Sequence, residues 1–229
     1  MSFNGRVGPL LIVSDGLVGC WDAASERSYP GSGTLWKDIS GQGNDATANN
    51  APVFVNQNGG YWNFAATNQY FSYDLYSGFD NAYIQSIDVS VEVWVRIGSL
   101  SPCCGAYWSF GGAQFEMAPS SGTSATYVVG GSPTWGLVSG GTNTDQWYCY
   151  TVTHAAGTTY KTYIDGVLNN SYSPSGNPQF TAGTGQFGTN NPLSGSYLEG
   201  DIAVVRMYNR ALTASEVKQN YDSTKVRFR

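Results

Sequence analysis

Charged side chains and histidine are scarce in this sequence. Asp, Glu, Lys and Arg make up only 12% of its 229 residues, and there is a single histidine, His154. The 16 acidic residues outnumber the 11 basic ones, which gives a net charge of −5. Affinity for nucleic acid depends on Lys and Arg that neutralise phosphates, so we expect no nucleic-acid partner. His154 stands at the end of an expected strand with no catalytic triad order around it, and we interpret it as structural.

Long apolar runs are also missing. No stretch approaches the roughly 20 apolar residues that a membrane-spanning helix needs. The first residues, MSFNGRVGPLLIVSDG, contain an apolar stretch that is too short for a signal peptide. We therefore expect no membrane insertion and no export by that route.

The four cysteines do not form a metal-binding pattern. Cys20, Cys103, Cys104 and Cys149 lack the paired spacing of a zinc site. Adjacent cysteines rarely bridge each other, because a single trans peptide strains the link. We expect reduced thiols, with a bridge between Cys20 and Cys149 as the alternative.

Short apolar segments bounded by Gly, Pro, Asn or Ser recur along the chain, a pattern typical of an all-β protein. Glycine is the commonest residue, with 29 copies, and 16 Tyr with 7 Trp supply much of the apolar area. The segments predict one domain spanning residues 1–229, an antiparallel β-sandwich of two sheets. The candidate strands are GLVGCWDA, YWNF, YFSY, DVSVEVWVRI, AYWSFGG, FEMA, ATYVVGG, WGLVSG, QWYCYTVTH, TYKTYIDGVLNNSYS, GQFGT and GDIAVVRMY.

Two of these segments carry sharper local signals. In DVSVEVWVRI, the branched residues from Val89 to Ile97 alternate with Ser, Glu, Trp and Arg, which predicts a half-buried strand. The pair Asp165 and Gly166 favours a two-residue type I′ turn, so TYKTYIDGVLNNSYS is expected to be a hairpin.

The chain ends in a helix signal and a basic tail. Thr213 with Glu216 three residues later forms a capping box, and Leu212 before it can pack on Val217, which predicts a short helix over 213–222. In the tail, residues 224–229, the basic residues alternate with apolar ones, as expected of an extended arm with its charges on one side. These basic residues are candidate assembly contacts, and a solvated terminus is the alternative: Lys225, Arg227 and Arg229.

Several segments resemble a known family. They are SDGLVGCWDAASERSYPGSGTLWKDISGQGNDATANNAPVF, VSVEVWVRI, WYCYTVTHAAGTTYKTYIDGVLNNS and GDIAVVRMYNRALTASEVKQNYDSTKVRF. Together they resemble the laminin-G-like branch of the concanavalin A-like lectin/glucanase superfamily, in the form common in structural proteins of tailed bacteriophages. This resemblance implies a jelly-roll sandwich whose first and last strands lie side by side.

The same resemblance implies a function. It predicts a non-enzymatic virion structural protein, assembled in the host cytoplasm, that decorates a capsid or forms part of a fibre or tail appendage. Its expected partners are the major capsid protein or other virion proteins, together with further copies of itself as a homo-oligomer. The alternative is a free-standing lectin module that binds host-surface glycans.

The sequence shows no catalytic or metal-binding pattern. The family's hydrolases carry a Glu-x-Asp-x-x-Glu strand, whereas Glu92 and Glu116 each stand alone here and are expected to face solvent. Where family members read Phe-Asp-Gly, this chain reads NFAATNQYF, with Ala65 and Ala66 in place of a carboxylate. We therefore expect no enzyme activity and no cofactor, with calcium as the alternative.

Aromatic and amide side chains are the candidates for sugar binding. Sugars present apolar faces to Trp and Tyr rings, while amides take their hydroxyls. The segments CCGAYWSFGG, GGSPTWGL and GTNNPLSG combine the two types. The candidate residues are Tyr107, Trp108, Trp135, Asn190 and Asn191.

Overall fold

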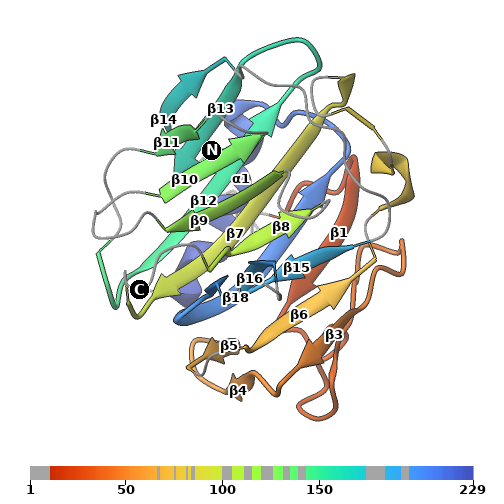
Figure 1. The fold of residues 1–229 in the computed structure, drawn as a ribbon, viewed down its shortest axis with the longest axis vertical. Helices are drawn as coiled ribbons and strands as arrows, with labels where there is room; N and C mark the ends of the chain where they lie inside the picture. Colours follow the sequence, from red (N-terminus) through yellow and green to blue (C-terminus); the bar gives the residue numbers. More distant parts are fainter. Residues whose placement is uncertain are drawn as a thin grey trace, which may run out of the picture.

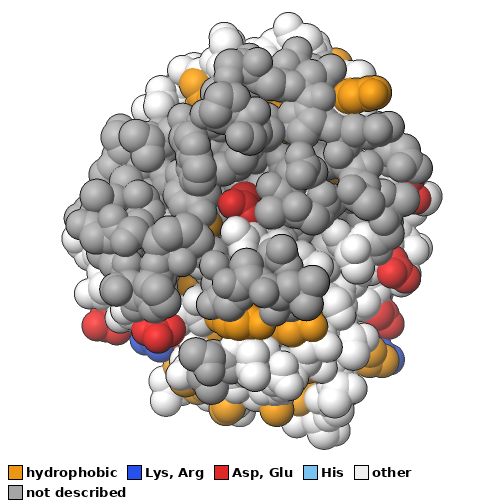
Figure 2. All heavy atoms as spheres, viewed as in Figure 1, with side chains coloured by type: hydrophobic (Ala, Val, Ile, Leu, Met, Phe, Trp, Pro, Cys, Tyr) orange, Lys and Arg blue, Asp and Glu red, His pale blue; other side chains and the backbone are white. Residues whose placement is uncertain are grey.

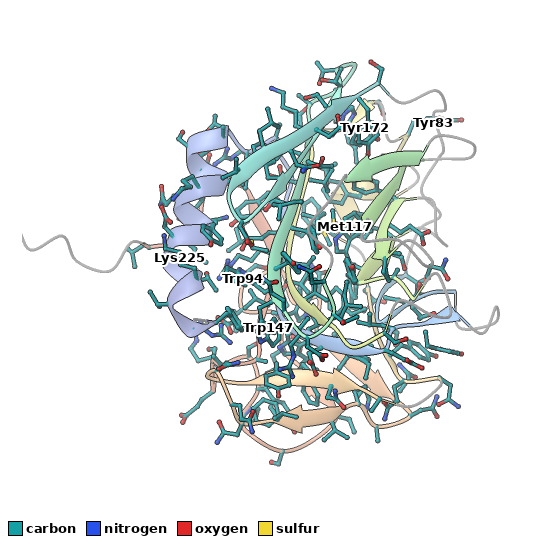
Figure 3. The ribbon with its side chains drawn as sticks, turned by 90° about the vertical axis from the view of Figure 1, so that its left-hand side faces the viewer. Tyr83, Trp94, Met117, Trp147, Tyr172 and Lys225 are labelled. Atoms are coloured by element: carbon teal, nitrogen blue, oxygen red, sulfur yellow. The ribbon has the colours of Figure 1, made fainter. Side chains whose placement is uncertain are left out.

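The computed structural model arranges the chain in three layers (Figures 1 and 3). It describes residues 11–65, 68–74, 76–80, 82–83, 86–99, 105–110, 115–119, 126–130, 135–138, 143–173, 184–191 and 196–228, with only the backbone at 126–130, 135–138, 191 and 196. Two antiparallel sheets, here named sheet A and sheet B, pack face to face, and helix α1 covers the outer side of sheet A. The expected two-sheet β-sandwich with a C-terminal helix is confirmed.

Sheet A follows the order β14-β13-β12-β7-β18-β5-β4, and β1 also pairs with β18. Its strands are β1 (Leu17–Asp22), β4 (Val53–Val55), β5 (Tyr61–Phe64), β7 (Val89–Ile97), β12 (Trp147–His154), β13 (Tyr160–Ile164), β14 (Val167–Tyr172) and β18 (Gly200–Tyr208). The pairing of β1 with β18 is antiparallel, so the first and last strands lie side by side as the resemblance implied.

Sheet B follows the order β11-β10-β9-β8-β15-β6-β3-β2. Its strands are β2 (Leu35–Trp36), β3 (Ala46–Asn49), β6 (Tyr70–Tyr73), β8 (Trp108–Phe110), β9 (Phe115–Pro119), β10 (Thr126–Gly130), β11 (Trp135–Val138) and β15 (Gly185–Phe187). A separate hairpin joins β16 (Thr189–Asn191) to β17 (Ser196–Tyr197). A short 3-10 helix, η1 (Ser77–Phe79), precedes β7.

The core lies between the sheets and is rich in aromatic rings. The residues Val89, Val91, Val93, Val95 and Ile97 share the inner face of β7 and are fully buried, as their alternation predicted. Opposite them, sheet B contributes large aromatic side chains that contact one another and the rings of sheet A. Figure 3 shows Met117 in this layer between the sheets.

The turn between β13 and β14 has the geometry that its sequence predicts. Asp165 and Gly166 have φ values of 52° and 77°, and Ile164 pairs directly with Val167. Positive φ at both central residues is the signature of a type I′ turn, so the expected hairpin is confirmed.

Helix α1 (Ala214–Thr224) begins at the capping box predicted from sequence. The Glu216 backbone N–H donates to the Thr213 Oγ1 atom, and the Thr213 N–H donates to the Glu216 carboxylate. Leu212 and Val217 are buried in one apolar cluster beneath the helix. The expected helix is therefore confirmed, with two residues more at its C-terminal end.

The helix makes β7 more buried than its alternating pattern indicated. Ser90, Glu92 and Trp94 alternate with the core residues, yet all three are at most 2% exposed, because they lie under the helical layer. Glu92 forms a buried ion pair with Arg206, which in turn donates to the Thr224 hydroxyl of α1. The prediction that Glu92 faces solvent was wrong, since a second apolar layer covers this side of the sheet.

The C-terminal tail is not an extended arm. Lys225–Arg227 form a further 3-10 turn, η3, and the ring of Phe228 stacks between those of Trp94 and Trp147. The expectation of an extended or solvated arm was therefore wrong for residues 225–228, because aromatic packing draws the chain back onto the sandwich.

The basic side chains of the tail pair within the chain. Lys225 binds Asp222, and the Arg227 guanidinium donates to the Asp22 carboxylate over 2.7 Å. Arg229 lies outside the described residues. The assembly role of these three cations stays a prediction.

Cys20 and Cys149 are free, buried thiols, as expected. They lie on β1 and β12, and β18 and β7 stand between these strands. Three strand spacings amount to about 14 Å, far beyond the reach of a disulfide, so the alternative bridge is excluded. Burial raises the pKa of the Cys20 thiol to about 11. Cys103 and Cys104 lie outside the described residues.

Candidate functional site

A row of polar side chains crosses the outer face of sheet B. Cross-strand pairing places Thr47 opposite Ser72, Ser72 opposite Gln186, Gln186 opposite Ser109, and Ser109 opposite Glu116. Residues directly opposite each other in a sheet point to the same face. We call these five residues, from strands β3, β6, β15, β8 and β9, the polar row.

The middle of the polar row is connected by hydrogen bonds. The Ser109 hydroxyl lies 3.1 Å from both the Gln186 Oε1 atom and the Thr189 carbonyl oxygen. Ser109 is fully buried, and Glu116 and Gln186 are at most 9% exposed, so the prediction that Glu116 faces solvent was also wrong. The β16–β17 hairpin therefore lies against the row and is attached to it through Thr189.

Two tyrosines flank the row where the hairpin meets β6. The rings of Tyr70 and Tyr197 have centroids 6.4 Å apart, and both side chains are half-buried. Tyr70 alternates with the core residue Phe71, so it shares the outer face with Ser72. An aromatic surface beside hydroxyl, amide and carboxylate groups is the combination that binds sugars.

At one end of the row lies a polar depression of about 170 Å³. Asp45, Thr47, Ser72, Asp74 and Thr184 line it. The Asp45 carboxylate accepts a hydrogen bond of 2.9 Å from the Asp38 backbone N–H. The depression thus offers two carboxylates and three hydroxyl groups to a ligand.

Figure 2 views this face of the molecule. Among the side chains it describes, Asp and Glu appear near the middle and along the edges, while Lys and Arg show only at the edges. The described part of the outer face of sheet B is therefore acidic, in keeping with the net charge of −5.

Two of the sugar-binding candidates from the sequence lie in the core. Tyr107 and Trp108 are fully buried, and Tyr107 stacks on Tyr150 across the sandwich with centroids 5.7 Å apart. Trp108 packs against Phe110 and Phe115. Neither ring reaches the surface, so the prediction that these two residues contact a sugar was wrong. Both residues belong to the core because aromatic strand residues fill the space between the two sheets.

The other three candidates lie near the polar row. Asn190 follows Thr189 in β16, is half-buried, and borders the row at Ser109. Asn191 ends β16, and its side chain lies outside the described part of the structure. The backbone of Trp135 pairs with Val129 in β10, which pairs in turn with Glu116. Their role in binding stays a prediction.

Neither the tyrosine pair nor the polar row was among the binding residues predicted from the sequence. The signal was present in the short strands YFSY, WSF, FEM and GQF, where one polar residue alternates with buried aromatic ones. Register across four strands brings these residues together, and no local pattern specifies register between strands far apart in the chain.

The sequence analysis singled out two further positions, His154 and Ala65. His154 is 1% exposed and its ring stacks on Tyr160 with centroids 4.2 Å apart, which fits its structural interpretation. Ala65 is exposed and brings only a methyl group to the position where the family carries a carboxylate. Calcium requires oxygen ligands, so Ala65 does not fit a calcium site there.

The two large antiparallel sheets with a helix on one outer face define a concanavalin A-like jelly roll. The family described as the Concanavalin A-like lectin/glucanases superfamily matches residues 71–218. This match covers more than half of the chain, and the protein therefore belongs to that superfamily, as a laminin G-like domain. No curated protein matches the chain.

Solved structures share the fold at low sequence identity. Trypanosoma rangeli sialidase in complex with 2,3-difluorosialic acid has a TM-score of 0.69 and 15% identity, covering 93% of this chain and 34% of the sialidase. The binding domain of botulinum neurotoxin serotype D has a TM-score of 0.68 and 12% identity, covering 92% of this chain and 52% of that domain. This chain thus spans about a third of the sialidase and half of the toxin domain, and the likeness shows the fold alone.

Proposed function

We propose that this protein is a non-enzymatic lectin module that binds a neutral glycan on the outer face of sheet B. The observation that carries the proposal is the position of the Tyr70–Tyr197 pair beside the polar row. The rings supply an apolar surface for a sugar face, and the half-buried Ser72 with the exposed carboxylates of Asp45 and Asp74 supplies partners for its hydroxyl groups.

The charge of the face favours a neutral sugar over an anionic one. Asp45, Asp74 and Glu116 all belong to this side of sheet B, and none of the residues that line the depression is a cation. A sialic acid or a sulfated sugar would bring a second negative charge beside these carboxylates. Like charges at close range cost binding free energy, so neutral glycans are the expected ligands.

Asp45 and Asp74 line the same depression, so the spacing argument applies only to Glu116, and it supports the proposal that the centre of the face is not a glycosidase site. A glycosidase needs two carboxyl groups about 5–10 Å apart. Glu116 and Ser72 are separated by three strand spacings, about 14 Å, and Asp74 lies two residues beyond Ser72. Every Asp and Glu of the sequence lies in the described ranges, and none besides Glu116 belongs to the central strands β8 and β15 or to β9.

A glycan array tests the proposal directly. We expect wild-type protein to bind neutral glycans and to ignore sialylated ones, equally with calcium and with EDTA. Tyr70→Ala should weaken binding about tenfold, because the stacking surface is lost. The matched control is Tyr83→Ala, which removes a tyrosine that is 48% exposed in the segment between η1 and β7. Equal binding by wild type and Tyr70→Ala, or no binding to any glycan, would contradict the proposal.

The second candidate function is that of a virion structural protein, and the sequence resemblance supports it. In that proposal, capsid or other virion proteins are the partners and the module is a decoration or appendage, with further copies in a homo-oligomer. Labelled electron micrographs of particles test it, and particles that carry no copies would remove it.

A further inference from the structure

A second cavity lies between the loop after β1 and the turn that joins β4 to β5. Its volume is about 210 Å³, and it shares no residue with the polar row. Tyr29, Pro30 and Phe54 give it an apolar wall, while Glu26 and Asn56 give it a polar rim. We call this cavity the loop pocket.

The apolar wall is rigid because it extends the core. The rings of Tyr29 and Phe54 have centroids 4.8 Å apart, and each also contacts the ring of Trp62, at 4.6 and 5.5 Å. Trp62 is only 2% exposed. Phe54 remains half-buried and Pro30 is exposed, so part of this wall is open to a ligand.

The polar rim is available for ligand binding. Glu26 and Asn56 are both exposed, and among the described residues neither side chain makes a hydrogen bond or an ion pair. A carboxylate accepts hydrogen bonds, and a carboxamide both donates and accepts them. The rim can therefore bind two neighbouring hydroxyl groups of one ligand.

Arg227 lies beside Gly59 of the pocket and joins the pocket's two sides. Arg227 donates from Nη1 to the Asp22 carboxylate over 2.7 Å, from Nε to the Asn58 carbonyl over 3.1 Å, and from Nη2 to the Gly60 carbonyl over 3.1 Å. These contacts join the end of β1 to the β4–β5 turn, which are the two sides of the pocket. No Lys or Arg lines the pocket itself, so the one charged group in its lining is the Glu26 carboxylate.

We propose that the loop pocket is a second binding site, for a single neutral sugar ring. The ring's apolar face packs on Phe54 and Pro30, and its hydroxyl groups bind the Glu26 carboxylate and the Asn56 amide. Arg227 acts as a positioning residue, because it fixes the two chain segments that carry these groups. This site is independent of the polar row, and the module would hold two sugars at separate positions.

Amide chemical shifts of nitrogen-15-labelled full-length protein test the site. The probes are methyl glycosides of glucose, galactose, mannose and N-acetylglucosamine, with choline as a cationic comparison. We expect one glycoside to shift the amides of Glu26, Gly31 and Asn56. Glu26→Gln should weaken this binding about tenfold, as expected for a lost hydrogen bond to a charged group, and Asn56→Ala about threefold, as expected for a neutral one. The matched control is Gln57→Ala, an exposed amide beside the pocket that does not line it.

The outcomes separate this site from the proposed function. Tyr70→Ala should leave the shifts at the loop pocket unchanged even where it abolishes binding to the array. Arg227→Lys should weaken glycoside binding at the pocket, whereas a merely structural role would lower only the melting temperature. The inference is overturned when no glycoside shifts these amides, when Glu26→Gln and Asn56→Ala bind as wild type does, or when choline binds there and no sugar does.

Discussion

The ring of Phe228, next to the last residue of the chain, stacks on the ring of Trp94 in the middle of β7, with centroids 4.6 Å apart and planes 22° apart. It also contacts Trp147 at 4.6 Å. Phe228→Ala should lower the free energy of unfolding by about 1–3 kcal/mol, because this half-buried ring loses two aromatic contacts. Urea unfolding followed by tryptophan fluorescence measures the loss.

Val226→Ala is the matched control for this prediction. Val226 lies two residues earlier in the same turn and is 70% exposed. Its truncation should change stability by less than about 0.5 kcal/mol. Equal effects of the two substitutions would mean that the tail is not attached through its aromatic ring.

The buried ion pair between Glu92 and Arg206 gives a second prediction. Both side chains are at most 3% exposed, and Arg206 also donates to Thr224 under the helix. Glu92→Gln leaves the guanidinium buried without its counter-charge, and we expect a loss of about 3 kcal/mol or more. Denaturant unfolding at constant pH measures it.

The double variant Glu92→Leu with Arg206→Met separates charge from packing. It removes both charges and keeps apolar volume, so it should be more stable than Glu92→Gln. A double variant that is no more stable than the single one would show that the pair itself contributes net stability.

Local chemistry made parts of the fold predictable from sequence. The turn at Asp165 and Gly166 and the capping box of Thr213 and Glu216 each lie within a few residues, and both formed as expected. The alternation in β7 correctly separated two faces, but it carried no information on what covers the outer one. Helix α1 covers it from more than 110 residues away in sequence, which is why Glu92 was assigned to solvent.

The candidate site was less predictable for a related reason. Tyr107 and Trp108 were chosen because aromatic residues stand next to Gly-rich segments, and that pattern is the same for a core strand and for a binding loop. Tyr70 and Tyr197 are 127 positions apart and meet only through sheet register and the β16–β17 hairpin. Such contacts depend on tertiary structure rather than on spacing.

The attachment of helix α1 should depend on pH through Glu216. The Arg210 guanidinium, which donates to both carboxylate oxygens at 2.6 and 3.0 Å, lowers the pKa of Glu216 from its ordinary value of 4.5 to about 2. A carboxyl group whose pKa is lower in the folded state stabilises the fold above pH 4.5. This contribution is lost as the pH falls from about 4.5 to about 2.

Melting temperatures of wild type and Glu216→Gln test this linkage. The wild type should be the more stable protein at pH 6, and the difference should shrink steadily as the pH approaches 2. Taking the difference between the two proteins cancels the acid sensitivity of the other carboxylates. A difference that stays constant between pH 6 and pH 2 would contradict the role of the Glu216 charge.

Gly105 connects the packing of the hairpin to binding on sheet B. A Cβ atom at this position would lie 2.1 Å from both the Tyr197 carbonyl carbon and the Leu198 backbone nitrogen, so Gly105→Ala must displace this backbone. Tyr197 belongs to the tyrosine pair beside the polar row. We therefore expect Gly105→Ala to weaken binding to neutral glycans about tenfold or more, while the far-ultraviolet circular dichroism of the sandwich is retained.

Gly98→Ala is the matched control, because its added Cβ would meet its nearest neighbour, the Glu199 carbonyl oxygen, at an ordinary 3.5 Å. It should bind glycans as wild type does, since nothing must move to accept the methyl group. If Gly105→Ala also binds normally, the ligand does not use Tyr197, and the binding surface must lie on the Asp45 and Asp74 side of the row. If both alanine variants lose binding, the ligand contacts the sandwich end near Glu199 instead, and the proposed site on sheet B is wrong.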